Sequence, residues 1–174
     1  MKYSVKLFVV TFLILFCTNT IAEEKIVVLD LTYVLNNSKA GKGAQDFLKK
    51  SYSQNAKKYS NMEEDLKKEE SDLLTKKTVL NKEEYKKKSD ELRKKVIEYQ
   101  SQRRTAIDKI SNQRRESREE LIKAIDPILA TYIKENNISM VIDKKNTLGG
   151  NPDSDITKFI IEKLNKKLPS LKLK

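Results

Sequence analysis

Residues 48–73 read LKKSYSQNAKKYSNMEEDLKKEESDL, and the spacing within this stretch decides the fold. One set of its positions is separated by alternating steps of four and three residues: Leu48, Tyr52, Asn55, Tyr59, Met62, Leu66, Glu69 and Leu73. This heptad spacing is typical of a helix that packs along one narrow seam against another helix. The intervening positions are mostly charged, which predicts that the other faces of the helix are exposed to solvent.

A second run with the same spacing supplies the partner helix. It consists of Tyr85, Ser89, Leu92, Val96, Tyr99, Arg103, Ala106, Ile110, Gln113, Ser117 and Leu121. Between the two runs, Asn81 followed by Glu84 is typical of a helix N-cap with a capping box, so we place a turn near residues 78–81. Folding the chain there brings Tyr59 near Tyr99 and Met62 near Val96, which predicts an antiparallel helical hairpin.

The hairpin is predicted to span residues 44–126. This segment has no Gly and no Pro, whereas Gly41 and Gly43 lie just before it and Pro127 just after it. It carries 22 basic and 17 acidic residues, as expected for a solvated helix pair. At 1.5 Å per residue, each helix would extend for roughly 60 Å. We call this segment the arm.

The segments on either side of the arm are predicted to form a small body, residues 23–43 and 127–174. Two short apolar runs, 26–29 and 138–142, read as strands that can pair only if the arm returns to its starting point. Asp153 or Asp155 can cap a last helix, which Pro169 ends. One face of this helix is apolar: Ile156, Phe159, Ile160 and Leu164. The predicted fold class is α+β.

Such a body is too small to bury a sufficient core alone, so we expect an oligomer assembled through it. The strand residues expected to line its core or its interface are Ile26, Val28, Ile138, Met140 and Ile142. Val27, Leu29 and Val141 point to the other side of the predicted strands. The alternation of side chains does not decide which of these two faces is the core.

The N-terminal segment has the features of a secretory signal peptide. Lys2 and Lys6 precede ten largely apolar residues, 7–16, which are too few to span a membrane. We expect cleavage after Ala22; an alternative is lipidation of Cys17, for which the preceding Phe16 is unusually bulky. Cleavage would leave 34 basic and 25 acidic residues, a net charge of +9, and no Cys for a disulfide.

The composition argues against several classes of function. The chain has no His, so it lacks the common general base and zinc ligand. Acidic pairs such as Glu69–Glu70 lie on an exposed helix without a cleft, so we predict no enzyme activity, no metal site and no cofactor. The signal peptide and the interleaved acidic residues disfavour nucleic acid, despite a pI of about 9.5. A basic secreted protein favours anionic lipid surfaces, lipopolysaccharide or acidic polypeptides as partners.

The order of these elements resembles the periplasmic chaperones of the Skp or OmpH family. The resemblance is carried by the ends of the chain, Ile26–Asp30, Ile138–Asp143, Asp155–Thr157 and Leu164–Asn165, more than by the arm. It implies a homotrimer in which a β body holds three arms around a cavity. It also implies an ATP-independent holdase in the periplasm that keeps unfolded outer membrane β-barrel proteins, its clients, soluble before membrane insertion. Contact with lipopolysaccharide is implied without assigned residues.

A holdase needs scattered apolar groups and a field that attracts clients before contact. The residues predicted to meet clients are Tyr52, Tyr59, Met62, Leu66, Tyr85 and Tyr99, with Lys57, Lys58, Lys87 and Lys94. The first six lie on heptad positions, so packing in the seam is the competing interpretation. Polar seam positions such as Asn55 and Gln113 are expected to loosen the arm so that it can bend around clients. The alternative function is a secreted coiled-coil spacer or adaptor with one defined partner.

Overall fold

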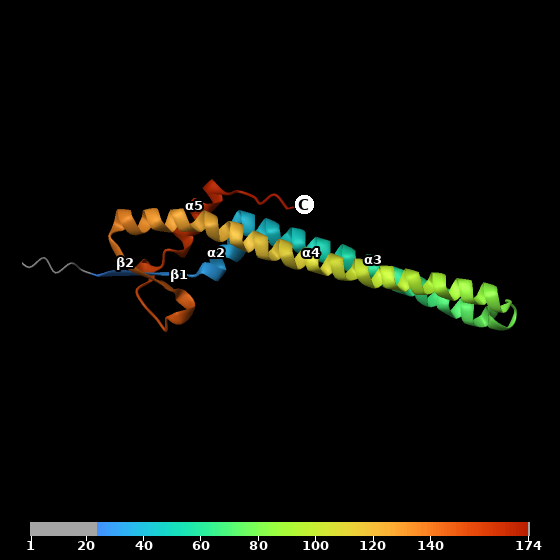
Figure 1. The fold of residues 1–174 in the computed structure, drawn as a ribbon. Coiled ribbons are helices and arrows are strands. Elements are labelled where there is room, and N and C mark those ends of the chain that lie inside the picture. Colours follow the sequence, from blue (N-terminus) through green and yellow to red (C-terminus); the bar gives the residue numbers. More distant parts are fainter. Residues whose placement is uncertain (1–23, 174) are drawn as a thin grey trace, which may run out of the picture.

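The computed structural model describes residues 24–173, a small body from which two long antiparallel helices project (Figure 1). The elements in chain order are β1 (Lys25–Leu29), α2 (Leu31–Asn37), α3 (Lys39–Thr75), η1 (Lys76–Thr78), α4 (Lys82–Asn136), β2 (Ile138–Asp143), η2 (Lys144–Asn146), η3 (Pro152–Ser154) and α5 (Thr157–Lys167). The predicted signal peptide, residues 1–22, lies outside the described residues. Within residues 24–173, no helix has both the length and the apolar character that a membrane span requires.

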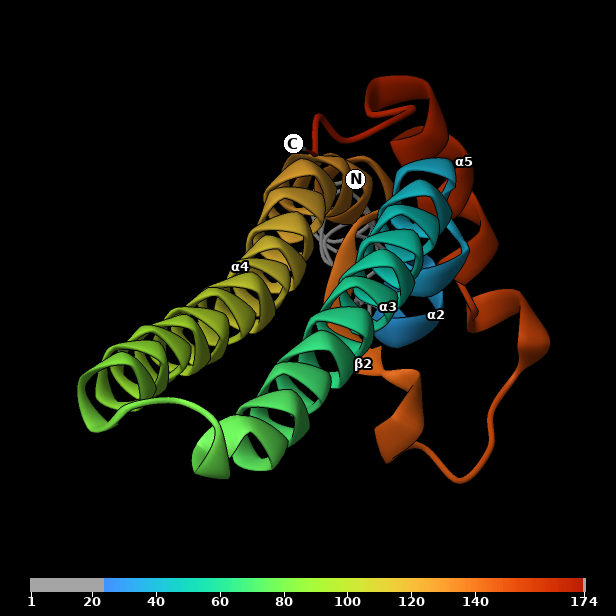
Figure 2. The same cartoon turned by 90° about the vertical axis from the view of Figure 1, so that its right-hand side faces the viewer.

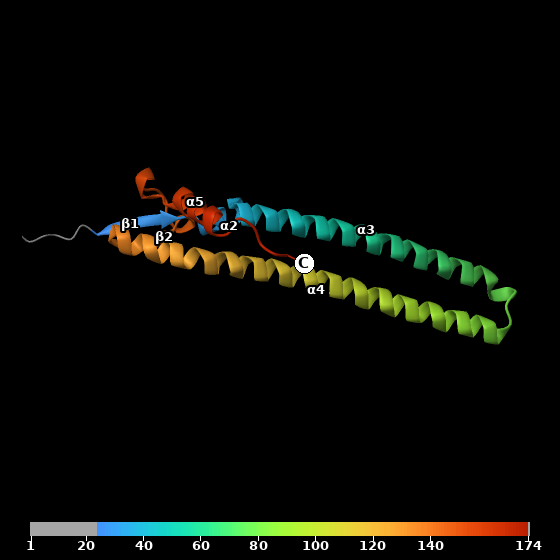
Figure 3. The same ribbon diagram turned by 90° about the horizontal axis from the view of Figure 1, so that it is seen from above.

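The arm is formed by α3 and α4, and its turn lies where the sequence predicts it. α3 ends at Thr75, and α4 begins at Lys82. The side chain of Asn81 accepts a hydrogen bond from the backbone N–H of Glu84 at 2.9 Å, which confirms the predicted N-cap. Seen along the arm and from above, the two helices run side by side from the body to the tip (Figures 2 and 3).

The two predicted strands pair, and they do so in parallel. The register joins Ile26 to Met140, Val27 to Val141 and Val28 to Ile142. A parallel pair needs a crossover between its strands, and the arm supplies it. On its other side, β1 forms an isolated bridge to Asp155, where the N–H of Ile156 donates to the carbonyl of Val28 at 3.0 Å.

The structure decides which face of the strand pair is the core. Val27 and Leu29 are buried, whereas Ile26 and Met140 on the opposite face are 44% and 55% exposed. Ile138, which we grouped with the exposed pair, is instead buried at the start of β2. It belongs to the core because the register shifts between Lys25 and Ile26, so Ile138 does not share the alternation of the residues that follow.

The core of the body gathers residues from both ends of the chain. It consists of Val27, Leu29, Val34, Leu35, Ala40, Leu121, Ile125, Ile138, Ile156, Ile160 and Leu164. The apolar face predicted for the last helix is therefore confirmed, since Ile160 and Leu164 are fully buried. The predicted cap by Asp153 or Asp155 is not formed, because the N-cap of α5 is Ile156, whose side chain cannot accept a hydrogen bond. Asp155 lies one residue earlier, and one of its carboxylate oxygens accepts from the N–H of Thr157 at 2.9 Å.

Both long helices extend further into the body than the sequence predicts. α4 continues through Pro127 to Asn136, so our expectation that this proline follows the helix is wrong. A proline inside a helix costs about 3 kcal/mol, but here the continued helix packs several apolar side chains against the core: Ile128, Leu129, Tyr132 and Ile133. α3 likewise begins at Lys39, and both predicted breakers, Gly41 and Gly43, lie inside it.

We expect that replacing the residue after α4 with Gly leaves stability unchanged, whereas replacing it with Ala lowers stability. Asn137 has φ 51° and ψ 47°, the left-handed conformation that favours Gly and Asn. Asn137→Ala should lower the free energy of unfolding by about 1 kcal/mol, because the added strain is of that order. Asn137→Gly should leave it unchanged within about 0.5 kcal/mol. Urea unfolding followed by circular dichroism measures both, and equal destabilisation by the two variants would contradict the argument.

Candidate functional site

The middle of the arm is held by two tyrosines from opposite helices. The rings of Tyr59 and Tyr99 meet edge to face, with centroids 6.1 Å apart, and each residue is only 8% exposed. The hydroxyl of Tyr59 donates to the carbonyl of Gln102 at 3.0 Å, and that of Tyr99 donates to a carboxylate oxygen of Glu63 at 3.2 Å. The predicted pairing of the two heptad runs is confirmed at this point. These tyrosines pack the seam in the single chain.

Charged side chains extend this contact across the seam. Glu63 also accepts from Lys67 at 2.8 Å, and Glu69 pairs with Lys95 of the opposite helix at 2.7 Å. The Lys67 ammonium and, less strongly, the Tyr99 hydroxyl hold the pKa of Glu63 below its ordinary value of 4.5. Burial, followed by the neighbouring carboxylate of Glu63, raises the pKa of Tyr99 above 10.0.

We expect these groups to make the stability of the arm depend on pH. Because the pKa of Glu63 is lowered in the folded protein, its contribution is present above pH 4.5 and is lost as the pH falls through the lowered value. Glu63→Gln should therefore lower the melting temperature at pH 7, with a much smaller difference from wild type at pH 3. Thermal melts followed by helix ellipticity measure this.

Glu64→Gln is the matched control for this prediction. Glu64 pairs with Lys68 one turn along its own helix, at 3.2 Å, and both side chains are largely exposed. An exposed pair within one helix contributes only a few tenths of a kcal/mol. A loss in Glu63→Gln that is the same at both pH values, or no larger than in the control, would contradict the role of Glu63.

The other residues predicted to meet clients divide into half-buried and exposed groups. Met62, Leu66 and Tyr85 are partly buried along the seam, so they offer only part of their surface. Tyr52 is 65% exposed although it occupies a heptad position. The four predicted lysines, Lys57, Lys58, Lys87 and Lys94, are exposed on both helices. The exposed set is therefore dominated by positive charge with one aromatic ring.

Two exposed apolar residues of α4 were not predicted. Ile97 is 60% exposed and Ile107 is 54% exposed. Neither falls on the heptad spacing, which is the only pattern that identified apolar positions in this segment. Ile107 lines a hollow of about 200 Å³ together with Tyr52, Tyr59 and Ile110, whereas Ile97 lies outside it. The available signal was an isoleucine that follows a heptad position, Val96 or Ala106, and precedes an acidic residue, Glu98 or Asp108.

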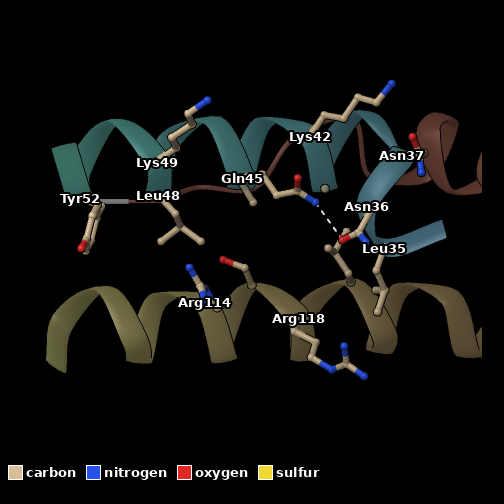
Figure 4. A pocket seen from close by; sticks show the side chains of 14 residues that line it. Leu35, Asn36, Asn37, Lys42, Gln45, Leu48, Lys49, Tyr52, Arg114 and Arg118 are labelled. Carbon is tan, nitrogen blue, oxygen red and sulfur yellow. Dashed lines mark hydrogen bonds between the residues drawn. The ribbon is translucent and has the colours of Figure 1, made fainter. Parts of the chain in front are cut away.

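A larger hollow of about 870 Å³ lies at the root of the arm, where α2, α3 and α4 meet. Its apolar lining comes from Leu35, Ala44, Leu48 and Leu121, and Tyr52 closes one end. Figure 4 shows Leu48 pointing down from α3 toward α4, and Arg114 reaching up from α4 into the space between the helices. Lys42, Lys49 and Arg118 line the rim and extend away from that space (Figure 4). We call this feature the root hollow.

Residues 24–173 offer no arrangement suited to metal binding. No group of three or more His, Cys, Asp or Glu side chains comes close enough together there to hold an ion. The root hollow has no acidic residue among its lining residues either.

The chain is similar to known proteins over most of its length. A family model described as outer membrane protein (OmpH-like) matches residues 25–164. A crystal structure from Caulobacter crescentus, described as an outer membrane chaperone (OmpH-like), superimposes with a TM-score of 0.78 at 16% sequence identity. That similarity covers 87% of this chain and 90% of the other chain, and it concerns the fold. The comparison with curated proteins gives no match.

Proposed function

Because the chain belongs to the OmpH-like outer membrane protein family, we propose that it is a periplasmic holdase chaperone. It binds unfolded outer membrane β-barrel proteins without ATP and keeps them from aggregating before membrane insertion. The family match over residues 25–164 carries this proposal. The N-terminal segment fits it, since a signal peptide cleaved after Ala22 would deliver the protein to the periplasm.

The surface of the arm supports binding of many weakly related chains. Its exposed lysines attract acidic clients at long range, and this attraction weakens as salt screens the charges. Its exposed apolar groups, among them Tyr52 and Ile107, then make contact with the client. A holdase that accepts many sequences does not need an enclosed pocket that is specific for one ligand.

The working form is a homotrimer assembled through the body. Ile26 and Met140 are partners in the strand register and lie on the face turned away from the core, 44% and 55% exposed. Val28 and Ile142 are the next pair on that face and are half-buried. A contiguous apolar face on such a small body is typical of a surface that another copy covers. Three arms would then surround a shared cavity.

Dilution of a urea-unfolded β-barrel membrane protein into the purified protein tests the holdase function. We expect light scattering from client aggregates to be suppressed, and a soluble complex to elute in size-exclusion chromatography with light-scattering detection. Raising the salt concentration should slow capture of an acidic client. If the client precipitates as it does in buffer alone, the holdase proposal is wrong. A spacer or adaptor with one stoichiometric partner then becomes the better hypothesis.

A further inference from the structure

We propose that the root hollow is a docking site, within a single arm, for a segment of unfolded polypeptide that carries apolar side chains beside a carboxylate. This inference rests on the proposed holdase function and deepens it. It places one point of client contact between the two helices of each chain. The hollow is therefore formed by each chain alone, whatever the number of chains in the assembly.

The size and lining of the root hollow fit apolar side chains. Its volume of about 870 Å³ lies within the range of sites that hold small ligands and exceeds what one side chain fills. Leu35, Leu48 and Leu121 present apolar atoms at its walls. These leucine side chains impose no hydrogen-bonding pattern, so different apolar side chains could enter between them.

The hollow continues along the arm, which favours an extended chain as its occupant. Tyr52 lines both the root hollow and the smaller hollow that contains Tyr59, Ile107 and Ile110. From Leu48 to Tyr59 the helix rises by roughly 16 Å at 1.5 Å per residue. An extended polypeptide covers that distance with about five residues. Alternate side chains of such a segment point to the same side and could contact both hollows.

The basic side chains around the root hollow favour an occupant that carries a carboxylate. Arg114 projects into the space between α3 and α4 (Figure 4). Within residues 24–173, no hydrogen bond or ion pair involves its guanidinium. Lys42, Lys49 and Arg118 on the rim add positive charge nearby although they extend away from the hollow, and no acidic residue lines it (Figure 4). A guanidinium in a partly apolar setting gains most from a carboxylate that accepts two parallel hydrogen bonds. An Asp or Glu next to an apolar residue meets this requirement.

Side-chain amides at the inner end of the hollow distinguish a polypeptide from a simple amphiphile. The side-chain amide of Gln45 donates to the side-chain oxygen of Asn36 at 2.8 Å (Figure 4). This bond leaves the side-chain amide hydrogens of Asn36 and the side-chain oxygen of Gln45 unused. These groups offer a donor and an acceptor to the backbone of a bound segment, which must keep its polar groups paired. A fatty acyl chain has no polar groups along its length that could form hydrogen bonds with these amides.

Peptide binding tests the proposal directly. The probe is a short fluorescein-labelled Ser-rich peptide, amidated at its C-terminus, that carries Asp-Leu-Phe-Asp; a second probe has Lys in place of both Asp. The variant Tyr52→Ser/Arg114→Gln removes an exposed ring and the inward charge with little risk to folding. The control Ile97→Ser/Arg104→Gln makes the same kinds of change at exposed positions of α4 that line neither hollow.

We expect the first variant to weaken binding of the acidic peptide about tenfold or more, and the control to change it by less than about twofold. The Lys peptide should bind wild type at least about tenfold more weakly. A photo-crosslinking residue at Gln45 should capture the acidic peptide, and one at Gln100 on the exposed side of α4 should not. Equal weakening in both variants, equal binding of both peptides, or crosslinking only at Gln100 would overturn the proposal.

Sodium laurate separates a lipid from a polypeptide as the occupant. If wild type binds laurate at the root hollow, as judged by the loss in Tyr52→Ser/Arg114→Gln, and does not bind the acidic peptide, the hollow takes amphiphiles and the proposal is overturned. The β-barrel dilution assay distinguishes failure of the holdase function from failure of the root hollow as a binding site. Failure of wild type to suppress aggregation removes the holdase function, whereas normal suppression with unaltered peptide affinity in the variant removes only the root site.

Discussion

Replacing Gly41 with Ala will disrupt the corner between α2 and α3, whereas the same change at Gly43 in the same helix will stabilise the protein. A Cβ atom at position 41 would overlap the carbonyl oxygen of Leu35 and lie 2.9 Å from the Ser38 hydroxyl oxygen. The first of these neighbours is backbone, so the corner itself would have to move. A Cβ atom at position 43 would meet nothing within 4 Å.

The two substitutions therefore change the free energy of unfolding in opposite directions, although both raise helix propensity. Gly41→Ala should lower the free energy of unfolding by more than about 3 kcal/mol, at the high end for single changes. The overlap also moves Leu35 in the core and Ser38, whose side chain accepts from the N–H of residue 41 at 3.2 Å. Gly43→Ala should raise it by up to about 1 kcal/mol, the usual gain for Ala over Gly in a helix.

Urea unfolding followed by circular dichroism separates these outcomes. Far-ultraviolet ellipticity reports mainly on the arm, because the arm contains most of the helix. Since the corner lies in the body, unfolding should also be followed by near-ultraviolet circular dichroism. If both variants are stabilised, then α2 can move away from α3 at no cost, and the tight corner is not a requirement of the fold.

Replacing Met140 with Asp will abolish assembly without unfolding the single chain. Met140 is 55% exposed on the sheet face that we propose as the trimer interface, so a carboxylate there is hydrated in the isolated chain. In the trimer it would be buried without a partner, at a cost of about 3–5 kcal/mol for each copy. Light scattering should then report the mass of one chain at concentrations where wild type shows three.

Ile97→Asp is the matched control, because Ile97 is similarly exposed, at 60%, but lies on the arm far from the sheet. It should retain the mass of wild type. Circular dichroism should give both variants the helix content of wild type, which separates loss of assembly from loss of folding. A Met140→Asp protein that still elutes as a trimer would move the interface elsewhere on the body, and a monomeric wild type would remove the trimer from the proposal.

The arm could be predicted from the sequence because its determinants are local and repeated. Heptad spacing fixes which side chains meet, and a break in the pattern at Asn81 fixes the turn, so the Tyr59–Tyr99 contact followed from counting residues. The two strands were likewise predicted by their short β-branched runs. These features depend on neighbours in the sequence, which a reader of the sequence can see.

What the sequence did not reveal depends on distant packing. Pro127 stays inside α4 because the turns after it are buried against the body, and this gain exceeds the cost of a missing hydrogen bond. The buried face of β1 could not be chosen, since both of its faces carry apolar side chains. The root hollow arises from the way α2, α3 and α4 diverge around residues that are ordinary in the sequence. Ile107 was missed because it lies outside the heptad pattern.

The parallel pairing of β1 with β2 has a consequence for the order of folding. The strands are separated by residues 30–137, and closing a flexible chain of about a hundred residues costs on the order of 4 kcal/mol in entropy. A hairpin that nucleates at Asn81 and zips toward the body removes most of that cost in small local steps before the strands meet. In the export that we propose, the first strand would cross the membrane before the second and would stay unpaired until the second follows. Substitutions near the turn should therefore slow folding, and those in the strands should mainly speed unfolding.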